Sequence, residues 1–182
     1  MSINKNKLLL HTCCAPCIIY VHRLLKPDYE VSAYYYNPNI YPEEEYERRK
    51  TELINYCNNV NLQLNIANKE FNNWLEVIRG LEHLPEGHER CWKCFEMRLE
   101  KTAVYAKING FNIFTTTLSI SPHKNAAKIN EIGFRLSEKH NINFLEADFK
   151  KNDGFKKAVD LSKQFNLYRQ TYCGCKYSVR NK

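Results

Sequence analysis

Apolar positions along the chain alternate between short strand-like runs and longer stretches with helical spacing. Residues 8–10 form a buried-strand run, and residues 15–25 repeat apolar side chains at helical spacing. Further strands are predicted at 31–36, 60–66, 111–118 and 142–147, and further helices at 42–57, 69–80, 91–109, 121–139 and 153–165. This order predicts an α/β fold with a Rossmann-like, mostly parallel sheet flanked by helices.

The chain shows no linker, low-complexity stretch or internal repeat, so we predict a single domain over residues 1–182. In a parallel sheet, ligands bind at the carboxyl ends of the strands. Segments 11–17, 36–40 and 117–124 each follow a predicted strand and are expected to share that edge. Ser121 and Pro122 are expected to cap and begin the helix that follows.

Composition is that of a soluble globular protein, with 43% hydrophobic and 26% charged residues among 182. No apolar run approaches the ~18 residues of a membrane span, and no signal-like segment opens the chain. We therefore expect a cytoplasmic protein without a membrane partner. The formal net charge of +7 fits an anionic partner such as nucleic acid, although many soluble proteins are equally basic.

Cysteine usage changes the picture, because a cytosolic protein seldom keeps disulfides and this chain has 8 cysteines. The motif HTCCAPC is expected at a strand-to-helix turn and CWKC at the start of a helix. Both places favour thiolates, because free backbone N–H groups gather there. Cys57 instead lies in register with the apolar face of its helix and is expected in the core. The other cysteines fall into the motifs HTCCAPC, CWKC and CGC, as Cys13, Cys14, Cys17, Cys91, Cys94, Cys173 and Cys175.

The number of clustered thiols exceeds the four that one iron–sulfur cluster requires. Adjacent residues such as Cys13 and Cys14 rarely aim at one atom, which favours a cluster plus a second metal. A structural zinc site and a redox-active dithiol remain alternatives on spacing alone.

Other residues near the predicted edge each have both a functional and a structural interpretation. His11 is a proton donor, a ligand, or a buried histidine satisfied by hydrogen bonds. Tyr34 and Tyr36 are expected in the core, although rings in this region could stack on bases. The segment FKKNDGFKK either grips a phosphate backbone or is a solvated lysine face.

Several long motifs together resemble one family, the QueH-type epoxyqueuosine reductases. The resemblance runs from about residue 11 to residue 178 and rests on HTCCAPC, YYYNPNIYPEEEYERRK, PEGHERCWKCFEMRLEKTA, FTTTLSISPHKNAAKINEIG, DFKKNDGF and LYRQTYCGC. It implies a HUP-like fold, a relative of the Rossmann arrangement. It also implies cobalamin-independent reduction of epoxyqueuosine to queuosine at the wobble position of tRNA.

The resemblance implies a [4Fe–4S] cluster beside a single metal ion, expected to be iron. Some family members have Asp where this chain has Cys17, so Cys17 is expected to ligate the single metal. The expected partners are the tRNA anticodon loop and an electron donor of unspecified identity. Three residues are candidate proton donors: His11, Asp148 and Tyr172. The remaining metal ligands implied are Cys13, Cys14, Cys91, Cys94, Cys173 and Cys175.

Two other functions compete with this interpretation. A sulfur-transfer or ATP-using tRNA enzyme of the same broad fold would need an SGGxDS-type phosphate loop after the first strand. HTCCAPC occupies that place. A zinc-stabilised RNA-binding module without catalysis would also account for paired cysteines.

Overall fold

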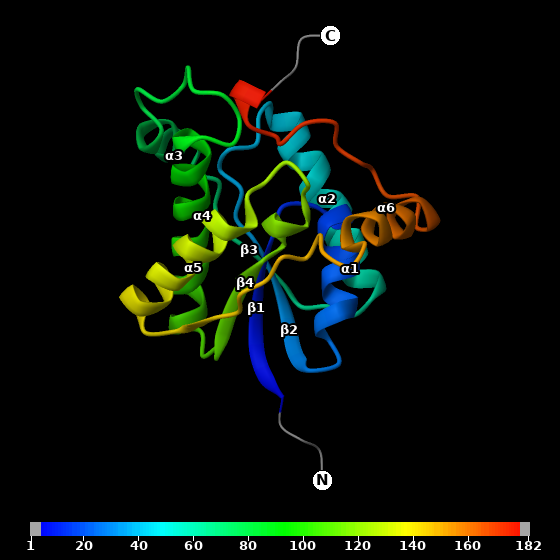
Figure 1. The fold of residues 1–182 in the computed structure, drawn as a ribbon. Helices are drawn as coiled ribbons and strands as arrows, with labels where there is room; N and C mark the ends of the chain where they lie inside the picture. Colours follow the sequence, from blue (N-terminus) through cyan, green and yellow to red (C-terminus); the bar gives the residue numbers. More distant parts are fainter. Residues whose placement is uncertain (1–4, 179–182) are drawn as a thin grey trace.

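A parallel five-stranded sheet forms the centre of the protein (Figure 1). We describe it from a computed structural model, covering residues 5–178. The strands lie in the order β3-β2-β1-β4-β5, and every pairing is parallel. The predicted Rossmann-like α/β fold is therefore confirmed. The strands are β1 (Asn6–Thr12), β2 (Tyr29–Tyr35), β3 (Leu64–Ile66), β4 (Ile113–Thr116) and β5 (Asn143–Phe144).

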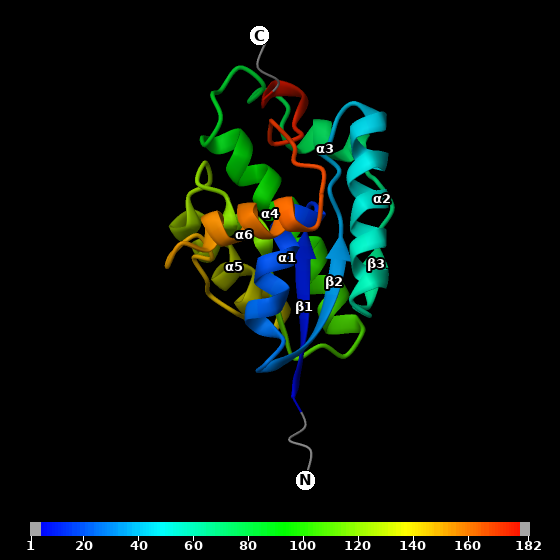
Figure 2. The same cartoon turned by 90° about the vertical axis from the view of Figure 1, so that its right-hand side faces the viewer.

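Helices cover both faces of the sheet, as Figures 1 and 2 show. One face carries α1 (Ala15–Leu25), α2 (Glu43–Asn59) and α6 (Gly154–Gln164). The other carries α4 (Glu89–Ile108) and α5 (Ala126–His140), with α3 (Phe71–Val77) packed against α4. Short 3-10 helices follow β4 (Thr117–Ile120) and end the described chain (Lys176–Ser178). Among residues 5–178, no helix is long and apolar enough to cross a membrane.

Both faces of β1, the central strand, are buried, which explains the continuous apolar run at residues 8–10. Successive side chains of a strand point to opposite faces. Leu8 and Leu10 accordingly pack with α1 and α2, whereas Leu9 packs with α4 and α5. A strand covered by helices on both sides needs apolar residues at every position.

The start of α5 corrects one prediction. Ser121 does not cap a helix, and α5 begins at Ala126. Asn125 is the N-cap, with its side chain accepting a hydrogen bond from the Lys128 backbone N–H at 3.1 Å. A 3-10 helix separates β4 from α5, and Ser121 follows it directly. The Ser121 hydroxyl instead accepts a hydrogen bond from the His123 backbone N–H in a tight turn. The predicted strands at 60–66 and 142–147 are also shorter than expected.

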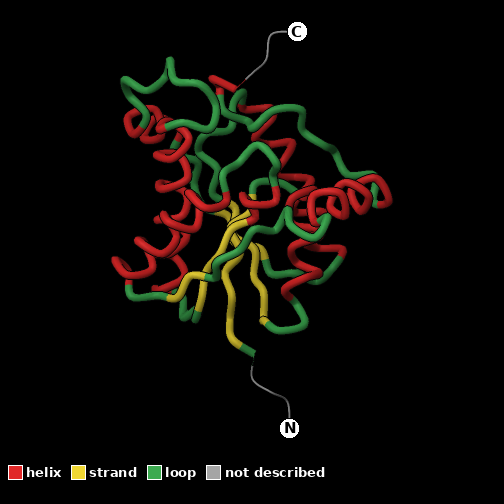
Figure 3. Tube along the Cα trace, in the orientation of Figure 1, coloured by secondary structure: helices red, strands yellow, loops and turns green. Residues whose placement is uncertain are grey.

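The connections at the carboxyl ends of the strands gather at one end of the molecule (Figure 3). Strand order reverses beside β1, which places the crevice of an open α/β sheet between β1 and β4. The chain after α6 returns across this end, where Ile40 pairs with Cys175 in an isolated bridge. The Tyr41 N–H also donates to the Gly174 carbonyl at 2.8 Å. Segments that are far apart in the sequence therefore meet at the crevice.

Candidate metal centre

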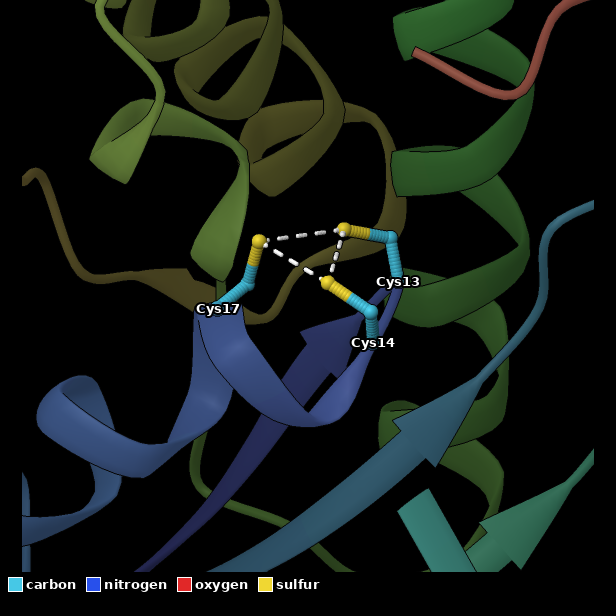
Figure 4. Close-up of side chains that lie close together, drawn as sticks. All are labelled: Cys13, Cys14 and Cys17. Atoms are coloured by element: carbon cyan, nitrogen blue, oxygen red, sulfur yellow. Dashed lines mark hydrogen bonds between the residues drawn. The ribbon is translucent and has the colours of Figure 1, made fainter. Parts of the chain in front are cut away.

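Three thiols converge at the end of β1. The Sγ of Cys14 lies 3.1 Å from that of Cys17 and 3.7 Å from that of Cys13, and Cys13 and Cys17 are 3.5 Å apart (Figure 4). We call these residues the cysteine triad. Among residues 5–178, only the triad brings three potential metal-ligand atoms within 4.8 Å of one another.

The backbone explains why the triad forms. Cys14 is the extended N-cap of α1, and Pro16 lies in the first turn, where its missing N–H costs no hydrogen bond. Cys17 then follows one turn along the helix and comes back beside Cys14. Hydrogen bonds with Cys14 and Cys17 hold the pKa of Cys13 well below its ordinary value. Burial, in contrast, raises the pKa of Cys14 to about 12. The three sulfur atoms are therefore linked by mutual S–H···S hydrogen bonds, in which Cys13 and Cys14 both donate to Cys17.

Four more cysteines form a second group, which we call the cysteine quartet: Cys91, Cys94, Cys173 and Cys175. Cys94 and Cys175 pack in one apolar cluster with Trp74 and Ile78, so α4 and the C-terminal segment meet there. Burial raises the pKa of Cys94, and charge on Cys173 raises it further. The backbone N–H of Gly87 donates to the Cys91 sulfur at 3.3 Å. Residues from two distant motifs, Cys94 and Cys173, therefore lie close enough to influence each other electrostatically.

The C-terminal segment is held in place by Arg49 and Gly174. Arg49 is 1% exposed, pairs with Glu45 at 2.6 Å, and donates to the backbone carbonyls of Tyr172 and Cys173. Gly174 has a φ of +100°, and a Cβ there would meet Arg49 Nη1 at 2.9 Å. Glycine between Cys173 and Cys175 is therefore required by backbone conformation and by close approach.

A cavity of about 230 Å³ opens beside the triad. Cys13, Cys17 and Cys173 line it, so both cysteine groups border one space. Its walls combine an apolar side from α6 with polar side chains from the loops, including Phe155, Ala158, Val159, Lys124, Gln170 and Tyr172. The Gln170 amide donates to the Cys14 sulfur at 3.1 Å.

The three candidate proton donors occupy different positions. Tyr172 lines the cavity, and its hydroxyl donates to the Tyr41 carbonyl at 2.5 Å. His11 is fully buried, with Nδ1 2.8 Å from Thr116 Oγ1 and Nε2 3.1 Å from the Tyr36 carbonyl. Burial, helped by the nearby Arg98, lowers the pKa of His11 to about 3, so its ring is neutral. Asp148 lies 2.8 Å from the Lys150 ammonium and is not among the residues that line this cavity.

The expected core residues lie where the sequence predicted. Cys57, Tyr34 and Tyr36 are each about 1% exposed. Two of the four lysines in FKKNDGFKK have hydrogen-bond partners in the protein: Lys150 donates to the Lys124 carbonyl, and Lys157 donates to the Asn152 carbonyl. A phosphate contact by this segment remains a prediction.

Sequence reasoning missed several charged residues at the site. Arg49, Arg90 and Arg98 are each 1% exposed, and Lys124 reaches the cavity from the turn before α5. A signal was present, because Arg90 directly precedes Cys91 and Arg98 follows Cys94 by one helical turn. Cations at helical spacing from metal-ligand motifs are expected to face the same site.

Comparisons with known proteins give a consistent picture. A family model described as epoxyqueuosine reductase QueH matches residues 8–181. The chain is 41% identical to the epoxyqueuosine reductase QueH of Acinetobacter baylyi over 180 residues, covering 98% of this chain and 83% of that protein. It is 38% identical to the QueH of Streptococcus pyogenes, covering 95% and 70%, and 34% identical to that of Thermotoga maritima, covering 94% and 90%.

Among solved structures, the chain is similar to the U34-tRNA thiolase NcsA from Methanococcus maripaludis, a structure that contains a [4Fe–4S] cluster. The TM-score is 0.59 and the sequence identity is 14%. The match covers 97% of this chain and 63% of the thiolase. At this identity, the likeness supports the fold alone.

Proposed function

We propose a function for this chain from the fact that it belongs to the epoxyqueuosine reductase QueH family. Members of this family are oxidoreductases of queuosine biosynthesis. The chain is inferred to reduce epoxyqueuosine to queuosine at the wobble position of tRNA. One observation of the structure carries this inference: Cys13 and Cys17 of the triad and Cys173 of the quartet border a single cavity at the switch point of the sheet.

The donor atoms fit a single metal ion at the triad. An ion with metal–sulfur bonds of about 2.3 Å in tetrahedral geometry separates its sulfur ligands by ~3.8 Å. The sulfur separations of 3.1–3.7 Å are close to that value. We infer that Cys13, Cys14 and Cys17 hold the single metal ion, expected to be iron.

The quartet fits a [4Fe–4S] cluster. Such a cluster takes four thiolates at its corners, which stand further apart than the ligands of one ion. Cys91, Cys94, Cys173 and Cys175 supply four thiols from two motifs without forming a second tight group among the described residues. When bound, the cluster would supply single electrons and the ion would act as a Lewis acid toward the epoxide oxygen.

The chain's own residues provide the rest of the chemistry. Converting an epoxide to an alkene consumes two electrons and two protons, and releases water. The α6 wall presents Phe155 and Val159 to the apolar part of the substrate and excludes water there. Tyr172 is the proton-donor candidate that the cavity favours, because it is the one candidate of the three that lines the same space as Cys13 and Cys17. His11 and Asp148 instead are inferred to support neighbouring backbone and side chains.

The substrate base reaches this cavity at low cost. A wobble nucleotide lies in the anticodon loop and is already single-stranded, so little stacking energy opposes its entry. The formal net charge of +7 favours association with the tRNA backbone. We place this reaction in the cytoplasm, together with an electron donor that delivers one electron at a time.

The direct test uses protein purified and reconstituted without oxygen. It would be incubated with tRNA containing epoxyqueuosine and a strong chemical reductant, and the digested nucleosides would be analysed by mass spectrometry. Conversion to queuosine without added ATP or cobalamin is expected. Protein with full iron and sulfide content that leaves epoxyqueuosine unchanged would contradict the proposal. An ATP-dependent thiolated product would indicate the sulfur-transfer alternative.

A further inference from the structure

Two buried arginines beside the cysteines have no acidic partner. Arg90 and Arg98 lie on α4 on either side of Cys94, and each is 1% exposed. Nε and Nη1 of Arg90 and Nε of Arg98 have no hydrogen-bond partner among the described residues. No ion pair within residues 5–178 includes either guanidinium.

Arg49 shows how this fold satisfies a buried arginine with hydrogen-bond acceptors from the protein itself. It is buried to the same extent, yet Glu45 accepts a hydrogen bond at 2.6 Å and two backbone carbonyls accept the others. A guanidinium cannot lose its proton, and an unpaired buried charge is strongly destabilising. Arg90 and Arg98 therefore require negative charge from another source.

Both arginines lie on the helix that carries Cys91 and Cys94. The guanidinium carbon of Arg90 lies 5.2 Å from the centre of the Tyr177 ring, which packs in the same apolar cluster as Cys94 and Cys175. Arg90 also directly precedes Cys91. Through Tyr177, Arg90 lies beside the apolar cluster that contains Cys94 and Cys175 of the quartet.

Arg98 lies between the two cysteine groups. Its Nη2 donates to Asn37 Oδ1 at 2.5 Å, and Asn37 in turn donates to the Thr12 carbonyl beside the triad. Arg98 also follows Cys94 by one turn of α4, so the two side chains lie on the same side of the helix. The two arginines together therefore span the quartet and the approach to the triad.

We propose that Arg90 and Arg98 are built-in counter-charges for the metal-bound thiolates, and that they raise the reduction potential of the centre. This inference rests on the proposed function, because it requires a cluster at the quartet. A [4Fe–4S] cluster with four thiolates carries a net charge of about −2 when oxidised, and each added electron makes it more negative. Fixed positive charge nearby stabilises the reduced state more than the oxidised state. Both arginines are positioning residues, acting on electron supply without touching the substrate.

The test compares reduction potentials in the anaerobically prepared holoenzyme. Arg90→Gln removes the charge, Arg90→Lys keeps it, and Arg79→Gln removes an exposed arginine that pairs with Glu76 on the surface. At a fixed applied potential, we expect Arg90→Gln to lower the ratio of reduced to oxidised cluster at least tenfold. For a one-electron step, a tenfold change corresponds to a reduction potential about 59 mV lower. Arg90→Lys should restore most of this ratio, and Arg79→Gln should match the unsubstituted protein. Redox titration followed by electron paramagnetic resonance measures the ratio.

Each outcome is decisive. An unchanged potential in Arg90→Gln, with full iron and sulfide, would overturn the proposal. If the Arg90→Gln protein binds no cluster, the iron and sulfide contents of Arg90→Lys and Arg90→Met are compared instead. A cluster in the lysine variant alone supports a role for charge, whereas any other pattern shows that shape is what matters. Unsubstituted protein lacking iron and sulfide would instead contradict the proposed function.

Discussion

Cys14 and Cys17 stand one helical turn apart at the start of α1, with their sulfur atoms separated by 3.1 Å. Both are free thiols, and Cys13 lies within 3.7 Å of each. Burial is among the causes that raise the pKa of Cys14 and of Cys17. Deprotonating all three thiols therefore needs a compensating cation, which a metal ion provides.

Cys17→Ala tests the assignment of the triad to the single metal. We expect the visible absorption of the cluster and its sulfide to persist, because the quartet is intact. One iron per chain should be lost, and epoxide reduction should fall by roughly 100-fold or more, because Lewis-acid activation of the oxygen is lost. Iron and sulfide analysis, together with turnover of epoxyqueuosine tRNA, measures each part.

Cys17→Asp is the matched control, since a carboxylate is also a competent iron ligand. It should recover part of the iron and part of the activity. Loss of sulfide in Cys17→Ala would show that Cys17 binds the cluster instead. Full activity in that variant would remove Cys17 from the essential metal ligands.

Serine substitutions should separate the metal-binding cysteines from Cys57. Anaerobic protein is expected to contain about four or five irons and about four sulfides per chain, as one cubane cluster plus one ion requires. Replacing any quartet cysteine with serine should lower both contents and abolish activity. Cys57→Ser should leave them unchanged, because Cys57 is 1% exposed in the core behind α1 and α2. An iron loss in Cys57→Ser equal to that in the quartet variants would refute this division.

The sequence predicted the fold and the position of the HTCCAPC cysteines because both depend on local patterns. Alternating apolar periodicity identified the strands and helices, and the carboxyl-edge rule brought Cys13 to the crevice. The division into triad and quartet depends on how the C-terminal segment returns over the sheet through the Ile40–Cys175 bridge. That contact is long-range and leaves no periodic signal. The start of α5 was misplaced because Ser121 and Asn125 are both good caps, and the 3-10 helix that decides between them is a tertiary feature.

Acid should destabilise the protein partly through His22. This side chain is buried on α1, with Nδ1 3.1 Å from the Tyr56 hydroxyl, and burial lowers its pKa below the ordinary value of 6.5. The unfolded chain then binds this proton more readily than the folded chain. The stabilising contribution is therefore present above about pH 6.5 and is lost as the pH falls further.

Denaturant midpoints measured anaerobically at pH 7.5 and 5.5 should fall less in His22→Gln than in the unsubstituted protein. The difference in the free energy of unfolding cannot exceed about 1.4 kcal/mol per pH unit for one proton. Equal acid sensitivity in the two proteins would exclude His22 as a contributor.

Tyr172→Phe tests the proton-donor assignment. Tyr172 lines the cavity, and among the described residues its hydroxyl hydrogen-bonds only to the Tyr41 carbonyl. Removing a general acid typically lowers the rate by roughly 100-fold or more. We expect that loss together with unchanged iron, sulfide and tRNA affinity. Tyr41→Phe is the control, because only the Tyr41 backbone carbonyl takes part in this contact; unchanged turnover in Tyr172→Phe would reassign the proton donor.

Gly174→Ala should release the C-terminal cysteines from the quartet. A side chain at a φ of +100° costs about 1–2 kcal/mol, and here the new Cβ would also meet Arg49 Nη1 at 2.9 Å and Ile40 Cγ1 at 3.0 Å. The bridge to Ile40 and the hydrogen bond from Tyr41 would then weaken together. Gly110→Ala is the matched control, because its φ is +72° but nothing lies within 4 Å of the added Cβ. Both variants should lose stability, whereas only Gly174→Ala should lose iron and sulfide, so equal metal content in the two would show that the C-terminal segment does not hold the cluster.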